Sequence, residues 1–192
     1  MWRSPVVVTP PEVEPIDLES AKAHLKVDDT VEDELIALHI AAARGHVESL
    51  TGTRMVTQEL VLTADTWEDL GHLPIGPVSE VLTITYRDSA GADAALAADA
   101  YEVRLHGLES AIVLRSGRAW PAREAGSLIT VSVVAGYGEA GVQPAEVMAA
   151  LKLLIGDFYA HRETVQVGSV AGRIPAVASV EALLANHKIH LV

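Results

Sequence analysis

Residues 28–54, DDTVEDELIALHIAAARGHVESLTGTR, specify the helix around which the chain is expected to fold. Their apolar side chains recur at alternating steps of four and three, which places them on one stripe of an α-helix. Thr30 is the expected N-cap, because its hydroxyl can accept a hydrogen bond from a free amide of the first turn. Gly52 is the expected stop, because glycine readily adopts the left-handed conformation that ends helices. The stripe consists of Ile36, Ile40, Ala43, Val47 and Leu50, with Leu35 and Leu38 beside it.

Helical patterns also lie on both sides of this stretch. Asp17 is placed to cap a short helix over residues 18–25, and a tight turn then leads into the long helix. Pro144 suits the first position of a helix that is apolar around most of its circumference from residue 147 to 160. Such a helix is buried in a core or in a subunit interface. Pro175 begins a last short helix, so about four helices are expected.

Between the helical stretches, the apolar period changes from 3.6 to two, as in β-strands. This predicts an α+β fold, in which a helical body carries an inserted small antiparallel β-domain. The expected strands cover residues 57–63, 81–86, 101–105, 111–114 and 128–134. The expected parts are an extended N-terminal arm (1–15), the helical body (16–56 and 140–186), the β-domain (57–139) and a C-terminal tail (187–192).

Composition excludes several classes of function. The chain of 192 residues has a net charge of −12, which argues against a surface that binds nucleic acid by neutralising phosphates. It has no cysteine, so disulfides and thiolate chemistry are excluded. The proline-rich start is expected to be an arm and not a signal peptide, and no apolar run is long enough to span a bilayer. We therefore expect a protein made and kept in the cytoplasm.

Residues 136–141, GYGEAG, match the G-x-G-x-x-G pattern of dinucleotide-binding loops. In such a loop the helix N-terminus binds the pyrophosphate. Here the helix begins only at Pro144, Glu139 brings negative charge to the loop, and no second parallel strand with an acidic residue follows. A glycine turn leading out of a strand is the preferred interpretation, and a nucleotide-binding enzyme is the rival.

The remaining polar residues do not form a catalytic or metal-binding pattern. His39 and His46 lie seven residues apart, whereas histidine pairs that bind a metal on one helix usually lie four apart. His187 and His190 have no carboxylate beside them in sequence. The acidic residues within positions 28–34 lie around a helix N-terminus. The helix dipole favours negative charge there, which accounts for them without a catalytic role. We therefore expect no metal, no cofactor, no catalytic residue and no enzymatic activity.

The sequence features that remain are surfaces: an apolar helix, an apolar tail, a proline-rich arm and a glycine- and valine-rich loop over residues 163–175. These features suit assembly with other subunits, and a monomer with disordered termini is the other interpretation that they allow.

The order of several short segments resembles the head–tail connector (adaptor) proteins of tailed phages and of phage-derived gene transfer agents. The resemblance spans most of residues 16–184. Its segments are IDLESAKAHL at 16–25, DELI at 33–36, AAAR at 41–44, TGTR at 51–54, LPIGPV at 73–78, AGYG at 135–138 and FYAHRE at 158–163.

This resemblance implies a structural protein of the virion, assembled in the bacterial cytoplasm and located at the head–tail interface. Such connectors form a twelve-fold ring that joins the portal protein to a stopper, neck or tail protein. DNA passes through the ring without sequence-specific binding, and the acidic chain suits such a channel wall. The alternative within the neck is a stopper or tail terminator.

The resemblance also implies which residues make contacts. The C-terminal tail of such connectors commonly inserts into the portal, which here corresponds to His187, Lys188, Ile189, His190, Leu191 and Val192. Side-by-side packing of the helices implies a subunit interface that includes Leu35, Leu38, Met148, Lys152 and Tyr159. The loop expected to meet the next neck component contains Val165, Val167, Val170 and Arg173, with the β-domain as the other candidate.

Overall fold

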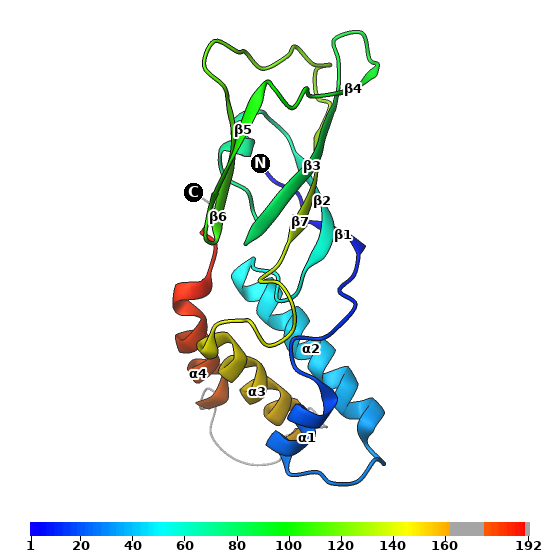
Figure 1. Ribbon diagram of the computed structural model, residues 1–192, viewed down its shortest axis with the longest axis vertical. Helices are drawn as coiled ribbons and strands as arrows, with labels where there is room; N and C mark the ends of the chain where they lie inside the picture. The colour runs from blue at the N-terminus through cyan, green and yellow to red at the C-terminus, as the bar shows by residue number, and fades with distance from the viewer. Residues whose placement is uncertain (162–174, 191–192) are drawn as a thin grey trace. The chain divides into compact units, whose positions relative to one another are not determined.

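A computed structural model of the chain describes residues 1–161 and 175–190, with side chains described outside 175–178. It confirms an α+β fold, and the described residues contain four α-helices and seven strands (Figure 1). The helices are α1 (Leu18–Leu25), α2 (Asp33–Thr51), α3 (Ala145–Ala160) and α4 (Pro175–Leu184). The strands are β1 (Val6–Thr9), β2 (Gln58–Ala64), β3 (Val78–Arg87), β4 (Asp93–Ala95), β5 (Tyr101–His106), β6 (Glu109–Leu114) and β7 (Ile129–Ala135).

The chain divides into two compact units. We call them the β unit, made of Met1–Pro11, Gly52–Tyr137 and the tail from Ile189, and the helical unit, made of Glu12–Thr51 and Gly138–Lys188. Two short 3₁₀ helices, Glu68–Gly71 and Ala185–His187, complete the described elements.

The larger sheet of the β unit has the strand order β1-β2-β7-β3-β4, and each neighbouring pair is antiparallel (Figure 1). Burial alternates strictly along β2 and β7, so every second side chain faces the core. Leu60 of β2 is paired with Val133 of β7, and both are fully buried. The period of two in the sequence therefore arises from a sheet with one covered face.

The hairpin of β5 and β6 supplies further residues to the core of the larger sheet. Tyr101 and Ile112 from the hairpin join Leu70 of the first 3₁₀ helix and the inward side chains of β2, β3 and β7. The ring of Trp67 stacks on that of Trp120, with centroids 4.8 Å apart. One hydrophobic core thus joins the inner strands of the larger sheet to the hairpin of β5 and β6.

Residues 6–9 of the N-terminal stretch form an edge strand of this sheet. Val6 is paired with Val61 and Val7 with Leu60, and the register shifts before Thr9. All four side chains of β1 are exposed. Such an edge is a potential site for pairing with another strand, and the flanking Pro5 and Pro10 limit its length.

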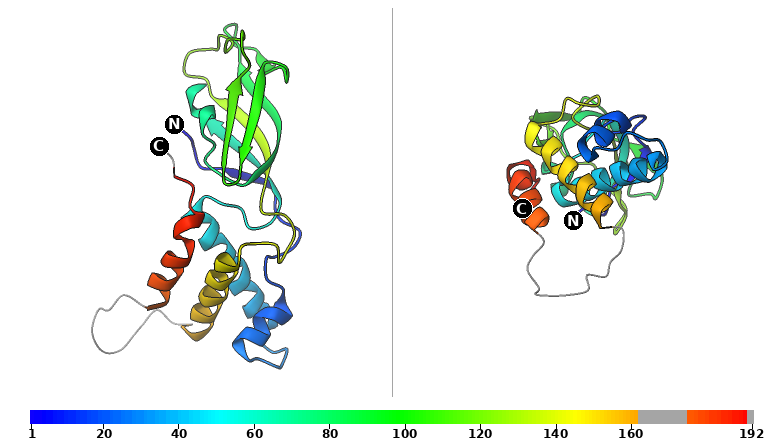
Figure 2. Two further views of the ribbon diagram at one scale, coloured as in Figure 1. Left: turned by 60° about the vertical axis from the view of Figure 1, so that its left-hand side comes forward. Right: turned by 90° about the horizontal axis from the view of Figure 1, so that it is seen from below.

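In the helical unit, α3 contacts α1, α2 and α4 (Figure 2). Its buried residues Val147, Leu151 and Leu154 face inward with Ile36 and Ile40 of α2. Several buried positions are alanines, including Ala21, Ala43 and Ala150, which allow the helices to approach closely. Within the described residues, no helix is both long and apolar enough to cross a membrane.

Two of the three expected helix ends near α1 and α2 are confirmed. Asp17 caps α1, because its carboxylate accepts hydrogen bonds from the amide and the hydroxyl of Ser20 at 2.7 and 2.8 Å. Gly52 follows α2 with a φ of 74°. Thr30 as the N-cap of α2 is wrong, since the helix begins at Asp33. The Asp29 carboxylate instead accepts from the amide of Val31 at 3.0 Å, and this local turn competes with the helix.

Candidate assembly surfaces

The long helix α2 exposes an uncharged face over several turns. Leu38 is 64% exposed, and Ala37, Ala42, Gly45 and Ser49 are also exposed. No residue between positions 35 and 43 carries an Asp, Glu, Lys or Arg side chain. In a chain with a net charge of −12, such a face is suited to contact another apolar surface.

Ion pairs hold the segments that pack on α2. The Lys22 ammonium of α1 lies 2.7 Å from the Asp33 carboxylate, and the Lys22 side chain is only 7% exposed. Arg44 donates from Nε to Glu14 at 2.7 Å and lies 3.4 Å from Glu48. The hydrogen bond to Glu14 raises the pKa of Arg44, so this guanidinium stays charged. These pairs position α1 and the segment before it.

Three of the residues expected at a subunit interface lie on α3. Met148 and Lys152 line one small hollow of about 180 Å³, together with Pro15 and Ile16 before α1. The Tyr159 hydroxyl donates a hydrogen bond to the Glu32 carboxylate, which links the end of α3 to the segment before α2. Tyr159 therefore has a structural role within the unit, and an interface role for these residues remains a prediction.

The C-terminal tail is only partly described. His187 Nε2 lies 3.8 Å from the Glu146 carboxylate, Lys188 is half-buried and His190 is exposed. Ile189 is half-buried in the β unit, close to Gly52 and Gly76. Leu191 and Val192 lie outside the described residues.

The loop expected to meet the next neck component also lies outside the described residues. This applies to all four residues proposed for it, which are Val165, Val167, Val170 and Arg173.

Within the glycine-rich residues 136–141, the first glycine and two backbone amides have structural roles in the β unit. A Cβ added at Gly136 would lie 2.4 Å from the carbonyl oxygen of Val56, so only glycine fits there. The Gly136 amide donates to the Pro77 carbonyl at 2.9 Å, and the Tyr137 amide donates to the Arg54 carbonyl at 3.1 Å. A phosphate-binding loop needs such amides to point at the ligand. Two of them are already engaged within the β unit.

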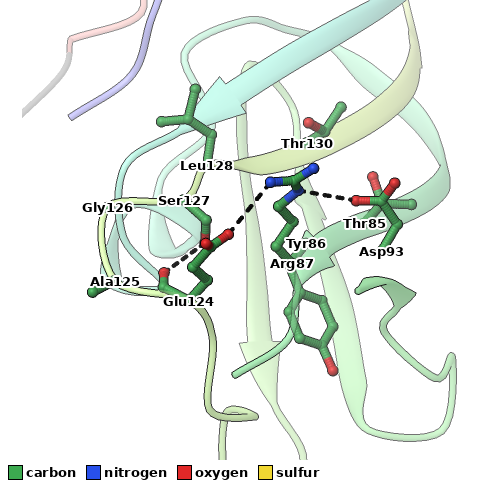
Figure 3. A pocket seen from close by; sticks show the side chains of 10 residues that line it. All are labelled: Thr85, Tyr86, Arg87, Asp93, Glu124, Ala125, Gly126, Ser127, Leu128 and Thr130. Carbon is green, nitrogen blue, oxygen red and sulfur yellow. Dashed lines mark hydrogen bonds and ion pairs between the residues drawn. The ribbon is translucent and has the colours of Figure 1, made fainter. Parts of the chain in front are cut away.

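An open hollow of about 720 Å³ lies between the end of β3, β4 and the segment before β7 (Figure 3). Arg87 lies between two carboxylates, 3.4 Å from Asp93 and 3.5 Å from Glu124, so its charge is balanced locally. The Ser127 hydroxyl donates to the backbone carbonyl of Glu124 at 2.8 Å. None of the residues that line the hollow is a histidine, cysteine or lysine, and the two carboxylates there are paired with Arg87.

The described part of the chain also holds no cluster of metal ligands. Within residues 1–161 and 175–190, no three His, Asp or Glu side chains come together as metal ligands would. The geometry of the described residues therefore offers contact surfaces and no cluster of metal ligands.

Sequence reasoning missed three of these surfaces. The run Val6-Val7-Val8 was a signal for the exposed strand β1, although it did not reveal the partner strand. The turn-forming residues 87–91 are a local signal for the loop beside the hollow but not for the hollow itself. The contact between Ile189 and the two glycines has no local signal, because its members are more than one hundred residues apart in the sequence.

Comparison with known proteins gives matches among solved structures alone, since no family model and no curated protein matches the chain. One similar chain comes from the neck of an empty gene transfer agent (GTA) particle computed with C6 symmetry, with a TM-score of 0.78. A second comes from the virion of a native GTA particle, with a TM-score of 0.77. A third comes from the neck of a native GTA particle computed with C12 symmetry, with a TM-score of 0.72. In each case the identity is 21%, and the match covers 99% of this chain and 97% of the other. The chain therefore has the fold of those proteins over nearly its full length.

Proposed function

We propose that this chain is a structural, non-enzymatic subunit of the neck of a phage-like particle. Its specific position is that of the head–tail connector (adaptor), between the portal protein and the next neck or tail protein. Twelve copies form a ring, and DNA passes through its channel without sequence-specific binding.

The observation that carries this proposal is the match in fold over 99% of this chain and 97% of a neck chain of a GTA particle. Because both chains are covered almost completely, the likeness includes the β unit, the helical unit and their order in the sequence. A common fold alone would allow many functions. The resemblance of the sequence segments to connectors supports the narrower position.

The exposed face of α2 supports a ring. A closed ring is built from heterologous contacts, in which one face of a subunit meets a different face of the next. The uncharged face around Leu38 supplies one such surface, and α3 supplies Met148 and Lys152 around a separate hollow. The ring size of twelve that we propose is supported by the C12 symmetry with which the neck of a native GTA particle was computed.

The C-terminal tail is proposed to bind the portal, and the loop over residues 163–175 or the β unit is proposed to meet the next neck component. The apolar side chains Ile189 and Leu191 are the anchors of the tail. Ordering a tail on binding costs conformational entropy, so free subunits are expected to remain monomeric until the portal is present.

The acidic balance of the chain suits a DNA channel. Phosphates are repelled by a surface of like charge, and the net charge of −12 thus favours passage of DNA over retention.

Analytical ultracentrifugation tests the proposal with the portal protein encoded near this chain. The full chain and a chain that lacks residues 186–192 are each mixed with portal rings. We expect the full chain to sediment with the portal and the truncated chain to remain free. Co-sedimentation of both would remove the anchor role of the tail.

Absence of any complex with the portal would contradict the connector position. A stopper or tail terminator would then be expected to bind tail components instead. The enzyme rival is tested by thermal unfolding with NAD or ATP, since a ligand at one hundred times its Kd stabilises a protein by about 2.7 kcal/mol. We expect no such stabilisation.

A further inference from the structure

The side chain of Ile189 lies over the backbone of two glycines. A Cβ added at Gly52 would lie 3.3 Å from Ile189 Cβ, and a Cβ added at Gly76 would lie 3.2 Å from Ile189 Cδ1. Both distances are tighter than ordinary van der Waals contact, so with a side chain at either position Ile189 would have to shift by a few tenths of an ångström. We call the surface formed by Gly52, Gly76 and Leu108 the tail site.

The floor of the tail site is a hydrogen-bonded part of the β unit. The Arg54 amide donates to the Gly76 carbonyl at 2.8 Å, and the Gly76 amide donates to the Gly52 carbonyl at 3.4 Å. The same added Cβ at Gly76 would lie 2.3 Å from the carbonyl oxygen of Leu108, in the turn after β5, so the backbone of Leu108 borders the Ile189 side chain. The floor is thus held by backbone hydrogen bonds and bordered by the backbone of Leu108.

The chemistry of this site fits a branched aliphatic side chain on an extended segment. Because Gly52 and Gly76 have no side chains, the Ile189 side chain can lie close to the backbone of the floor. Ile189 is half-buried there, whereas the next residue, His190, is exposed. Successive residues of an extended segment point to opposite sides, so one inward and one outward side chain are expected of a tail bound along a surface.

We propose that the tail site holds Ile189 in the free subunit and that the portal competes with this site for the same side chain. The second half rests on the proposed function. One isoleucine cannot be buried in two places, so the tail must leave the site before it inserts elsewhere. The apparent affinity for the portal is then lowered by the fraction of subunits whose tail is released.

This arrangement keeps the apolar anchor covered until a partner is present. The tail site therefore acts as an intramolecular cover for a side chain whose partner in the particle is a different protein.

Hydrogen–deuterium exchange of the full-length chain, followed by mass spectrometry, tests the first half of the proposal. The variants are Ile189→Ser and its matched control His190→Ser, which changes an exposed neighbour. We expect Ile189→Ser to increase the exchange rate about tenfold in peptides that contain residues 52–54 and 76, because the backbone there opens more often once Ile189 no longer covers it. Peptides from β7 should be unchanged in both variants. Equal exchange in Ile189→Ser and in the unsubstituted chain would overturn the tail site.

The second half is tested by the same measurement on the unsubstituted chain in the presence of saturating portal rings. We expect exchange at residues 52–54 and 76 to rise to the level of the free Ile189→Ser variant. A portal complex in which exchange stays low at these residues would overturn the competition. If sedimentation detects no complex, the proposed function fails, while the comparison of the free variants still decides whether the site holds Ile189.

Discussion

The β unit and the helical unit are stabilised in different ways. The β unit has one large core in which Leu60, Leu62 and Ile84 are buried among aromatic rings. The helical unit buries small residues such as Ala21 and Ala43, and it positions its first helix and the preceding segment with ion pairs and a polar cap. The helical unit also exposes Leu38, which is the most exposed leucine among the described residues.

This difference suggests that the core of the β unit mainly determines stability, while the outer face of α2 mainly serves assembly. A sheet with one covered face buries the apolar side chains of that face within the subunit, although the edge strand β1 exposes Val6, Val7 and Val8. Helices that present alanine and leucine outward leave apolar surface that only a second molecule can cover. The β unit is therefore expected to respond most to changes in its core, and the helical unit to changes in polar contacts and in the face of α2.

The largest effect on folding is expected for Leu60→Ala in the core of the β unit. Removal of a fully buried leucine leaves a cavity and lowers the free energy of unfolding by about 2–5 kcal/mol. Leu82→Ala on β3 is the matched control, because Leu82 is 39% exposed, and it should lose much less. Urea unfolding followed by tryptophan fluorescence measures both. Equal losses would contradict the account of the β core.

A smaller effect is expected for Asp17→Ala, which removes the N-cap of α1. Loss of such a cap lowers the free energy of unfolding by about 1 kcal/mol at pH 7. Hydrogen bonds from the Ser20 amide, and then from its hydroxyl, lower the pKa of Asp17 below its ordinary value of 3.8. The contribution of ionised Asp17 is therefore complete above pH 3.8 and is lost as the pH falls through the lower pKa of the folded state.

Asp17→Asn is the control for this pH dependence. Asparagine keeps an acceptor for the Ser20 amide but does not titrate, so this variant should lose less stability than Asp17→Ala at pH 7. Urea unfolding of the three proteins at pH 7 and at pH 3 makes the comparison. If the difference between the unsubstituted chain and Asp17→Ala is the same at both values, the ionised cap is not the source of the stability.

Glu14→Gln should have an effect of similar or smaller size. It removes the charge that pairs with Arg44, whose side chain is partly exposed, and the expected loss in free energy of unfolding is about 1 kcal/mol or less. Salt screens such a pair, so the loss should shrink in 1 M NaCl. Glu12→Gln, an exposed neighbour, serves as the control and should be neutral at both salt concentrations. A larger loss at high salt would contradict an electrostatic role for Glu14.

Leu38→Ser should have the smallest effect on folding and a large effect on assembly. A surface substitution changes the free energy of unfolding by about 0.5 kcal/mol at most. The variant should fail to form complete rings on the portal, because the exposed face of α2 loses its largest apolar side chain. Sedimentation with portal rings compares it with Leu82→Ser on the β unit. Normal rings with Leu38→Ser would remove this face from the proposed interface.

The sequence allowed prediction of the features that depend on neighbouring residues. The short helix after Asp17, the end of α2 at Gly52 and the alternation in β2 and β7 follow from local capping, backbone freedom and periodicity. The start of α2 was predicted two residues too early because a turn at Asp29 competes with the cap. Local competition of this kind is not visible in residue type alone.

The surfaces were harder to predict because they depend on residues far apart in the sequence. Nothing near Val6 indicates that β2 is its partner strand, and nothing near Ile189 indicates Gly52 and Gly76. The hollow beside Arg87 requires the turn after β3 to meet the segment before β7. Long-range pairing of this kind is decided by the whole fold, which the local patterns constrain only partly.

Native mass spectrometry of the complex between portal rings and the full-length chain tests the central claim most directly. The mass of one subunit is 20.3 kDa, so the number of bound copies can be counted from the added mass. The account predicts twelve copies on each portal ring at saturation. Complexes with an intermediate number of copies should be absent, as expected for a closed ring. Portal rings that bind no copies, or a variable number of copies at saturation, would contradict the claim that this chain forms the connector ring.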